Sequence, residues 1–346
     1  QTKIPYVIFC DHKRYWNVFK PICDEFEKRG IELVYYTCSP DDPALNEKYN
    51  HIRAEFIGEG NKAFVRMNLL NAGVVLSTTP GLDVLQWKRS KNVNKYVHIP
   101  HTVDDLSGYR MFGLDYYDAV LCTGQNQINL IRKIESLRPK IQKKDLAIVG
   151  SPNMDEAYNR VKNFTRTENN TPVVLLAPSW GPSSILNRFG EKLISALLES
   201  EFKIIVRPHP QSRIAEKEML DKLAHTFEGK SIEWNYDNDN LSVMYRSDVL
   251  ITDFSGIIFD YSLLFNRPLL YADTSFDTLP YDADWLDEKL WTFSSLEKIG
   301  IKLEEKDFVN IRQIITDALE SSNLAEARES VKNECWQNIG NSAKAI

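Results

Sequence analysis

The feature that most constrains the fold of this chain is an alternation that runs through its whole length. Short runs of β-branched and apolar residues are followed repeatedly by segments whose apolar residues recur with the period of a helix. This order is typical of parallel sheets, because each crossover between parallel strands needs a long connection, which is usually helical. The sequence therefore predicts an α/β protein built from doubly wound parallel sheets.

The predicted strands fall into two groups separated by a polar stretch at residues 160–171, which is typical of a linker. The strands of the first group are Tyr6–Cys10, Glu32–Tyr36, Val74–Ser77, Lys95–Ile99, Ala119–Thr123 and Ala147–Val149. Those of the second group are Val173–Ala177, Lys203–Val206, Ser231–Trp234, Val249–Thr252 and Pro268–Tyr271. Because 346 residues exceed one typical core, we predict Rossmann-like domains over residues 1–160 and 171–320. A helical tail over 321–346 is predicted to pack back on the first domain.

Composition excludes some classes of function. The net charge of −6 gives no overall positive field for nucleic acid or an anionic bilayer. Five scattered cysteines without a CxxC pair favour reduced thiols and a cytoplasmic location over a disulfide framework or a zinc knuckle. No apolar run reaches the length of a membrane-spanning helix. The start at Gln1 leaves open that the sequence is part of a longer protein.

The segment Arg207-Pro-His209-Pro directly follows a predicted strand of the second group. Ligands of open parallel sheets bind outside the carboxyl ends of the strands. Two prolines fix the backbone there, so that Arg207 and His209 form a rigid pair suited to the phosphates of a nucleotide diphosphate. The alternative is that Arg207 pairs with a carboxylate and His209 bonds a backbone carbonyl.

A second candidate anion site follows the strand that ends at Thr252. After Asp253, the pair Ser255 and Gly256 is predicted to open a helix, whose free N–H groups and positive dipole end attract phosphate. An ordinary serine N-cap next to a glycine is the alternative interpretation.

A third candidate is His101, which follows the predicted strand Lys95–Ile99 and is placed to take a proton from an acceptor hydroxyl. Asp104 or Asp105 is a candidate to orient its ring, although a solvated acidic turn fits the sequence equally well. His98 lies within the strand and is predicted to be packed in the core.

The loop after the first strand carries His12, Lys13 and Arg14 in sequence. Together with Asp104 these residues are candidates for the acceptor side of the site, because Lys13 and Arg14 suit an anionic polymer end. A solvated loop is the alternative.

Four motifs occur in the order of a known family. They are VGSPNMD at 149–155, LLAPSW at 175–180, RPHP at 207–210 and SDVLITDFSGIIFDYSLLFNRPLLY at 247–271. This set resembles the CDP-glycerol glycerophosphotransferases, whose usual forms are GYPRxD, APTW, RPHP and ITDYSSIFFDY followed by KPIIFY. The resemblance spans about residues 95–275. The family's WHGTPxK segment reads IPHTVDD here, and its Ser-Ser pair reads Ser255-Gly256.

The resemblance implies a GT-B fold, in which two Rossmann-like domains face each other across a cleft. It also implies metal-independent transfer of a polyol phosphate, glycerol or ribitol phosphate, from a CDP-linked donor held by the C-terminal domain. The family's two functional histidines correspond to His101 as the base and His209 at the pyrophosphate. Arg207, Thr252, Asp253, Ser255 and Gly256 correspond to the donor site.

The function predicted from this resemblance is that of a cytoplasmic transferase in teichoic acid, cell wall or capsule biosynthesis. Its partners would be a CDP-linked donor and a polymer or lipid-linked acceptor, with no cofactor, no metal and no nucleic acid. Peripheral association with the inner face of a membrane, the acceptor and the oligomeric state are left open. Two alternatives remain: a GT-B glycosyltransferase that uses a nucleotide sugar, and a catalytically idle nucleotide-binding module of a larger capsule-assembly protein.

Overall fold

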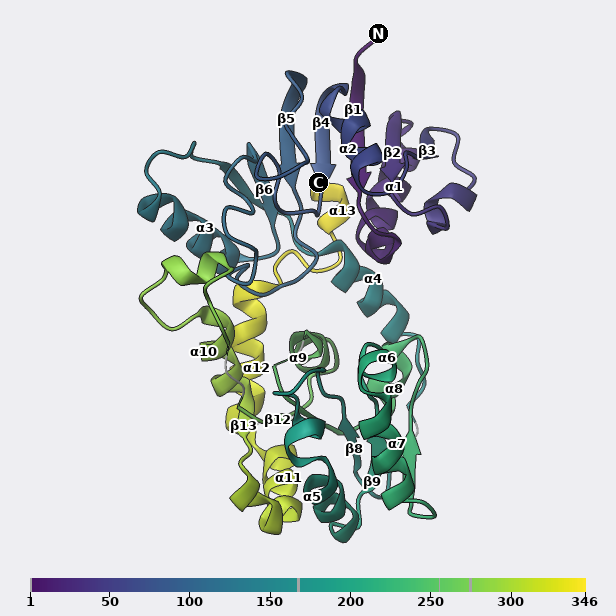
Figure 1. Ribbon diagram of the computed structural model, residues 1–346, viewed down its shortest axis with the longest axis vertical. Helices are drawn as coiled ribbons and strands as arrows, with labels where there is room; N and C mark the ends of the chain where they lie inside the picture. The colour runs from purple at the N-terminus through teal and green to yellow at the C-terminus, as the bar shows by residue number, and fades with distance from the viewer. Residues whose placement is uncertain (1, 167–168, 255, 274–275) are drawn as a thin grey trace. The chain divides into compact units, whose positions relative to one another are not determined.

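The computed structural model describes residues 2–166, 169–254, 256–273 and 276–346, which divide into two compact units (Figure 1). Unit 1 consists of Gln1–Glu156, Asp277–Trp291 and Asn333–Ile346, and unit 2 of Ala157–Phe276 and Thr292–Lys332. The predicted domain ranges are continuous in sequence, whereas the chain of the structure returns to unit 1 twice after it has entered unit 2.

Unit 1 contains a seven-stranded parallel sheet in the order β3-β2-β1-β4-β5-β6-β7. Its strands are β1 (Ile4–Cys10), β2 (Leu33–Thr37), β3 (Ile52–Phe56), β4 (Asn71–Ser77), β5 (Asn92–His98), β6 (Ala119–Cys122) and β7 (Asp145–Ile148). Six of them match predicted strands, and the prediction lacks β3. That strand lies at the sheet edge and none of its residues is fully buried, so it has no apolar run to reveal it.

The helices of unit 1 connect these strands. They are η1 (Lys13–Tyr15), α1 (Trp16–Arg29), η2 (Pro43–Asn46), α2 (Asn61–Asn68), α3 (Gln125–Leu137), η4 (Asp282–Trp285) and α13 (Ser342–Ala345), and α4 (Pro152–Val161) runs on into unit 2. Helix α1 ends at Gly30. The φ angle of Gly30 is 66°, and its N–H donates to Glu27 O, so the glycine provides the left-handed residue that closes the helix.

Both faces of this sheet are covered. On one face Phe19, Ile22 and Cys23 of α1 pack against Ile8 of β1 and Tyr35 of β2. On the other face the chain between β4 and β6 contributes the buried side chains Leu82, Trp87, Leu106, Leu114 and Tyr117. Apolar residues on both sides of a parallel sheet are what a doubly wound unit requires.

Unit 2 contains a six-stranded parallel sheet in the order β10-β9-β8-β11-β12-β13. Its strands are β8 (Val173–Leu176), β9 (Lys203–Val206), β10 (Ile232–Trp234), β11 (Val249–Thr252), β12 (Leu269–Tyr271) and β13 (Gly300–Lys302). The five predicted strands are found, and the prediction lacks the three-residue edge strand β13. Two doubly wound parallel-sheet α/β units confirm the predicted fold class.

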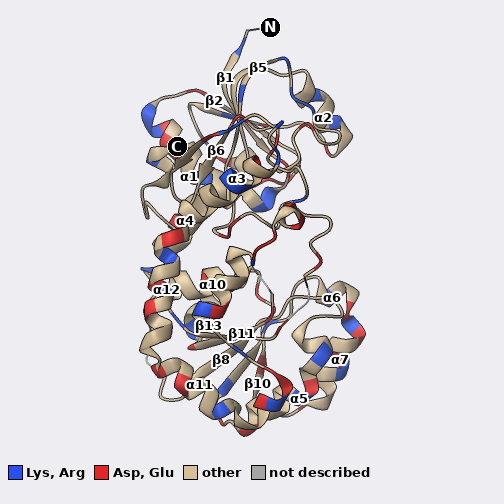
Figure 2. Cartoon of the chain, turned by 90° about the vertical axis from the view of Figure 1, so that its left-hand side faces the viewer, with Lys and Arg blue, Asp and Glu red and all other residues tan. Residues whose placement is uncertain are grey.

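The helices of unit 2 lie between and after these strands. They are α5 (Ile185–Glu199), α6 (Ser212–Ala215), α7 (Lys217–Thr226), α8 (Asn240–Arg246), α9 (Ile257–Phe259), the π-helix η3 (Asp260–Leu264), α10 (Trp291–Ile299), η5 (Glu305–Asn310), α11 (Ile311–Glu320) and α12 (Ser322–Cys335). Figure 2 shows acidic and basic residues mixed along helices such as α7, as expected for surface helices.

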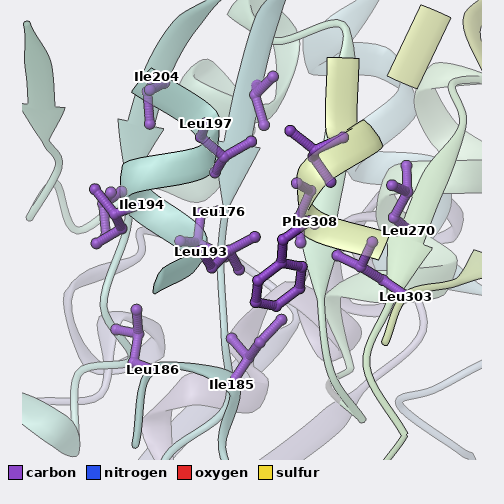
Figure 3. Close-up of a cluster of buried hydrophobic side chains, with 14 of the residues drawn as sticks. Leu176, Ile185, Leu186, Leu193, Ile194, Leu197, Ile204, Leu270, Leu303 and Phe308 are labelled. Atoms are coloured by element: carbon purple, nitrogen blue, oxygen red, sulfur yellow. The ribbon is translucent and has the colours of Figure 1, made fainter. Parts of the chain in front are cut away.

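The core of unit 2 is an aliphatic cluster around α5 (Figure 3). Leu193, Ile194 and Leu197 of this helix are completely buried, together with Leu176 of β8 and Leu270 of β12. Burial of each such side chain contributes about 1.5–3 kcal/mol relative to its exposure. The strand ends of unit 2 are therefore held by a dense core.

The C-terminal segment of the chain is fastened to unit 1 through Asp155. The Asp155 carboxylate accepts hydrogen bonds from Gly340 N at 2.8 Å, Ser342 N at 3.2 Å and Ser342 Oγ at 2.5 Å. Asp155 is the last residue of the motif VGSPNMD, so the acidic residue of this motif holds the end of the chain.

Candidate functional site

His101 follows β5 in unit 1 and contacts the residues that follow two other strands. Its Nδ1 lies 2.9 Å from the Oγ1 of Thr78, which comes directly after β4. Its ring centroid is 4.5 Å from that of Tyr15, in the turn η1 after β1. The ends of β1, β4 and β5, which are neighbours in the sheet, therefore meet at this imidazole.

The environment of His101 keeps its imidazole neutral. Burial and then the charge of Arg14 lower the pKa of His101 from 6.5 to about 4, and a hydrogen bond to the Thr78 backbone opposes the shift. Because a bond that favours the charged imidazole has the ring N–H as its donor, we assign the proton to Nδ1. Nε2 then carries a lone pair, which is the state that a proton acceptor needs.

Neither aspartate after His101 orients its ring. Asp104 Oδ1 accepts from Thr102 Oγ1 at 3.1 Å and from Leu106 N at 3.0 Å, which closes its own turn. Burial, followed by the charge of Asp105, raises the pKa of Asp104 to about 6. Asp105 accepts from Ser107 N and Ser107 Oγ. The position that holds His101 is Thr78, which the sequence analysis did not single out.

His98 is buried, as the strand alternation predicts. Its Nε2 lies 2.8 Å from the hydroxyl of Tyr109, and its ring packs edge-on against Tyr109 and Tyr117. Burial holds the pKa of His98 well below its usual value.

The basic candidates His12, Lys13 and Arg14 form the exposed turn after β1. His12 Nδ1 accepts from Arg14 N at 3.1 Å, and Lys13 pairs with Asp41. The guanidinium of Arg14 lies 4.8 Å from the centre of the Tyr15 ring, and no carboxylate partner of Arg14 is found within the described residues. Of the two cations, Arg14 is thus the one that can bind an anion without breaking an ion pair.

Arg207 and His209 stand at the end of β9 in unit 2, as predicted. Arg207 Nη1 donates to Asn235 Oδ1 at 2.5 Å, and Arg207 N donates to Leu176 O at 2.8 Å. Burial lowers the pKa of His209, and its Nδ1 accepts from Gln211 N at 3.1 Å. A neutral imidazole that accepts at Nδ1 carries its proton on Nε2, so His209 presents one N–H donor.

The residues that follow β11 divide into two groups. Thr252 and Asp253 are completely buried, and their side chains bond the loop after β8. Thr252 Oγ1 donates to Ala177 O at 2.7 Å, while the Asp253 carboxylate accepts from Ser179 N at 2.8 Å and Ile185 N at 2.9 Å. Their side chains thus hold the loop after β8, a role that the motif by itself does not reveal.

The other two candidates of this turn are Ser255 and Gly256. Ser255 lies outside the described residues, so its predicted phosphate contact stays a prediction. Gly256 is exposed at the N-cap of α9 with a φ angle of −60°. That φ angle suits any residue, and an added Cβ would meet no atom within 4 Å, so the backbone does not require glycine here.

The described residues contain no group of three or more His, Cys, Asp or Glu side chains that could hold a metal ion. Among them there is also no helix with the length and apolar character needed to span a membrane.

Comparison with known proteins first defines the class. The chain shares its fold with the wall teichoic acid polymerase TagF, at a TM-score of 0.59 and 16% identity, covering 99% of this chain and 86% of that one. It is also similar to a putative UDP-N-acetylglucosamine 2-epimerase from Listeria monocytogenes, at a TM-score of 0.62 and 13% identity, covering 99% and 94% of the two chains. The predicted GT-B class is therefore confirmed.

The sequence is also similar to a known family. Residues 118–285 match the model of the CDP-Glycerol:Poly(glycerophosphate) glycerophosphotransferase family, which confirms the resemblance carried by the motifs. The teichoic acid poly(glycerol phosphate) polymerase of Bacillus subtilis (strain 168) is 23% identical over 286 residues. The match covers 78% of this chain and 35% of that protein, so the chain spans about a third of the length of this relative. The matched region contains Arg207 and His209, whereas His101 precedes it.

Proposed function

We propose that this chain transfers a polyol phosphate, glycerol or ribitol phosphate, from a CDP-linked donor to a hydroxyl of a polymer or lipid-linked acceptor. The observation that carries the proposal is the pair at the end of β9, a fixed Arg207 beside a neutral His209 that presents an Nε2–H, within the region matched by the family model. A guanidinium and an N–H donor suit the two phosphates of a nucleotide diphosphate.

The proposed step is a displacement at the phosphorus that carries the polyol. The acceptor oxygen forms a new P–O bond, and the P–O bond of the pyrophosphate breaks. CMP leaves with the bonding electron pair, and the hydroxyl proton passes to Nε2 of His101. Arg207 and His209 stabilise the charge that develops on the phosphates. An anionic acceptor would raise the pKa of His101 from its low value and make it a stronger base, because a nearby negative charge favours the imidazolium.

In this scheme the chain needs no cofactor and no metal ion, since protein cations balance the phosphate charge. The test is to measure transfer in the presence of excess EDTA, where an undiminished rate is expected. A loss of rate that Mg²⁺ restores would contradict this part of the proposal.

We place the protein in the cytoplasm, in teichoic acid, cell wall or capsule biosynthesis. Its five cysteines are free thiols, which a reducing compartment preserves. A lipid-linked acceptor would bring the protein to the inner face of the membrane as a peripheral partner. Nucleic acid has no part in the proposal.

The donor is tested by thermal unfolding with CDP, CMP, UDP, GDP, CDP-glycerol and CDP-ribitol. A ligand at about a hundred times its dissociation constant stabilises the folded state by about 2.7 kcal/mol. We expect the largest shifts with the CDP compounds and a smaller shift with Arg207→Ala. A larger shift with UDP or GDP would favour a glycosyltransferase, and no shift with any nucleotide would exclude the donor site.

An idle binding module is tested separately by product analysis. The transferase releases CMP when donor and acceptor are both present, and His101→Ala should remove this activity while donor binding persists. Donor binding without CMP release from the unmodified chain would identify an idle module.

A further inference from the structure

Two oxygen atoms that follow the neighbouring strands β1 and β4 of unit 1 have no hydrogen-bond partner among the described residues. They are Oδ1 of Asp11 and Oγ1 of Thr79, and both are closed off from solvent although the residues themselves are only half-buried. Within the described part of the chain, no side-chain hydrogen bond or ion pair to Asp11 is found. Neither residue has a role in the site as described above.

The two atoms belong to adjacent strand ends. In the register of the sheet Phe9 of β1 pairs with Ser77 of β4, and Asp11 and Thr79 each come two residues later. The order of strands reverses between β1 and β4, and ligands of doubly wound sheets bind at such a reversal.

Asp11 and Thr79 also adjoin the parts of unit 1 that hold His101. Thr79 follows Thr78, whose hydroxyl contacts the imidazole. The pKa of Tyr15, whose ring packs on His101, is raised by burial, lowered by Arg14 and raised by Asp11. Asp11, the proposed base and the cation of Arg14 thus lie around the Tyr15 ring, and Thr79 is the chain neighbour of the residue that contacts the base.

A carboxylate oxygen shut off from water without a donor is costly to the folded state. Folded proteins rarely retain such an atom unless a ligand or solvent molecule supplies the missing bond. The aspartate after β11 of unit 2, the strand that corresponds to β4, shows the ordinary solution, since both oxygens of Asp253 accept backbone N–H groups.

The chemistry of the pair restricts its ligand. A carboxylate has only acceptors and repels phosphate, whereas hydroxyl groups can donate to it, and a threonine hydroxyl can both donate and accept. The phosphate of the same ligand would find its cation in Arg14, which lies over the Tyr15 ring without a carboxylate partner within the described residues. A ligand with adjacent hydroxyl groups at one end and a phosphodiester further along satisfies all three residues.

We propose that Asp11 and Thr79 form a subsite for the free hydroxyl end of a polyol phosphate chain, which presents its terminal hydroxyl to His101. The inference rests on the proposed function, because that function makes such a chain the acceptor. It assigns the selection of the acceptor to Asp11, a residue outside the region matched by the family model.

The first test is binding without donor, measured by titration calorimetry with a short glycerol phosphate oligomer that has a free hydroxyl end. Asp11→Asn and Thr79→Val should each weaken binding at least about 10-fold, since unmatched polar groups in such a site cost one or more hydrogen bonds. The matched control is Glu59→Gln, which removes an exposed carboxylate of the same unit and should bind as the unmodified protein does. Equal binding by Asp11→Asn and the unmodified chain would overturn the proposal.

The second test changes the terminal unit of the oligomer. An oligomer whose terminal unit lacks the secondary hydroxyl, and one capped by phosphate, should each bind to the unmodified chain at least about 10-fold more weakly than the free-hydroxyl oligomer. Asp11→Ala should abolish this discrimination. Because these measurements involve no donor and no turnover, they stand even if CMP release is never observed, and a chain that releases CMP but binds all three oligomers alike would refute the subsite alone.

The third test separates ligand binding from a structural role. Since no side-chain hydrogen bond or ion pair of Asp11 is found among the described residues, Asp11→Asn should leave the melting temperature unchanged or raise it. A fall of several degrees would show that the carboxylate supports the fold, and the proposal would then fail.

Discussion

The two sheets share a strand order and differ in what stands at the ends of their central strands. In unit 2 the buried side chains at the end of β11 have hydrogen-bond partners, because Thr252 and Asp253 bond the loop after β8. In unit 1 the strands β1 and β4, which correspond to β8 and β11, are followed by Asp11 and Thr79, each with a buried oxygen that lacks a partner among the described residues. The same topology thus serves two purposes. In unit 2 the side chains at the central strand ends fix a loop, whereas in unit 1 the side chains at these ends are available to bind a ligand.

The difference extends to the histidines. His209 of unit 2 accepts a backbone N–H at Nδ1 and therefore presents a donor at Nε2. Nδ1 of His101 in unit 1 lies 2.9 Å from the Thr78 hydroxyl, and with the proton assigned to Nδ1 its Nε2 presents a lone pair. Two neutral imidazoles acquire opposite roles from the bond made by their other nitrogen.

The largest effect should come from the two histidines. His101→Ala should lower the transfer rate about 10²–10⁴-fold with the donor dissociation constant unchanged, because a base acts in the transition state. His209→Ala should lower the rate and also weaken donor binding. Steady-state kinetics together with donor titration separate the two variants, and the exposed His225 serves as control, with His225→Ala expected to be neutral. Identical effects of both variants on donor binding would contradict the assignment of His101 as the base and of His209 to the donor.

Removal of the Asp253 carboxylate should destabilise unit 2. Asp253→Ala leaves two backbone N–H groups without an acceptor, which costs about 2–4 kcal/mol in the free energy of unfolding. Urea denaturation measures this loss. Asp221→Ala on α7 removes an exposed carboxylate paired with Lys217 and should change stability by less than about 0.5 kcal/mol. A loss for Asp253→Ala no greater than for this control would contradict the structural role.

Thr78 should act as a positioning residue for His101. Thr78→Val keeps the shape of the side chain but removes the hydroxyl 2.9 Å from Nδ1, and should lower kcat about 5–10-fold, the worth of one hydrogen bond. The KM for the donor should not change, and Thr78→Ser should restore most of the rate. Thr102→Val removes a hydroxyl that bonds Asp104 and is the matched control. A merely structural role of Thr78 would lower stability without this rescue.

The smallest effect concerns pH. His101 loses its function as a base when it becomes protonated, so activity falls as pH drops through its pKa, which lies at about 4 in the free protein. The charge of Arg14 contributes to that low value, and its removal raises the pKa. Arg14→Ala should therefore shift the acidic limb of kcat/KM to higher pH, by less than about one unit because Arg14 is exposed. The pH profile of Lys13→Ala, whose charge pairs with Asp41, should remain in place, and a shift of the Arg14 variant to lower pH would contradict the assignment.

Prediction from sequence succeeded where one local pattern sufficed. Buried strands such as β8, β9 and β11 are continuous apolar runs, and the strand ends that follow them carry recognisable motifs. The edge strands β3 and β13 were not predicted, because β3 (IRAEF) has Arg53 and Glu55 between its apolar residues in place of a continuous apolar run, and β13 (GIK) has a single large apolar residue. Asp253 was assigned to the donor because its motif position is visible in the sequence, while its bonds to Ser179 and Ile185 are not.

The sequence alone determined the fold class, the resemblance to the family and the strand ends at which Arg207, His209 and His101 stand, because these depend on periodicity and on residues close together in the chain. Only the tertiary structure decided which polar atoms are satisfied. The partner of His101 comes from the end of β4, the partners of Asp253 come from the loop after β8, and those of Asp155 come from the end of the chain. Parallel sheets bring together residues that are far apart in sequence, so hydrogen-bond partners at their carboxyl edge are fixed by strand order and register, which no local pattern records.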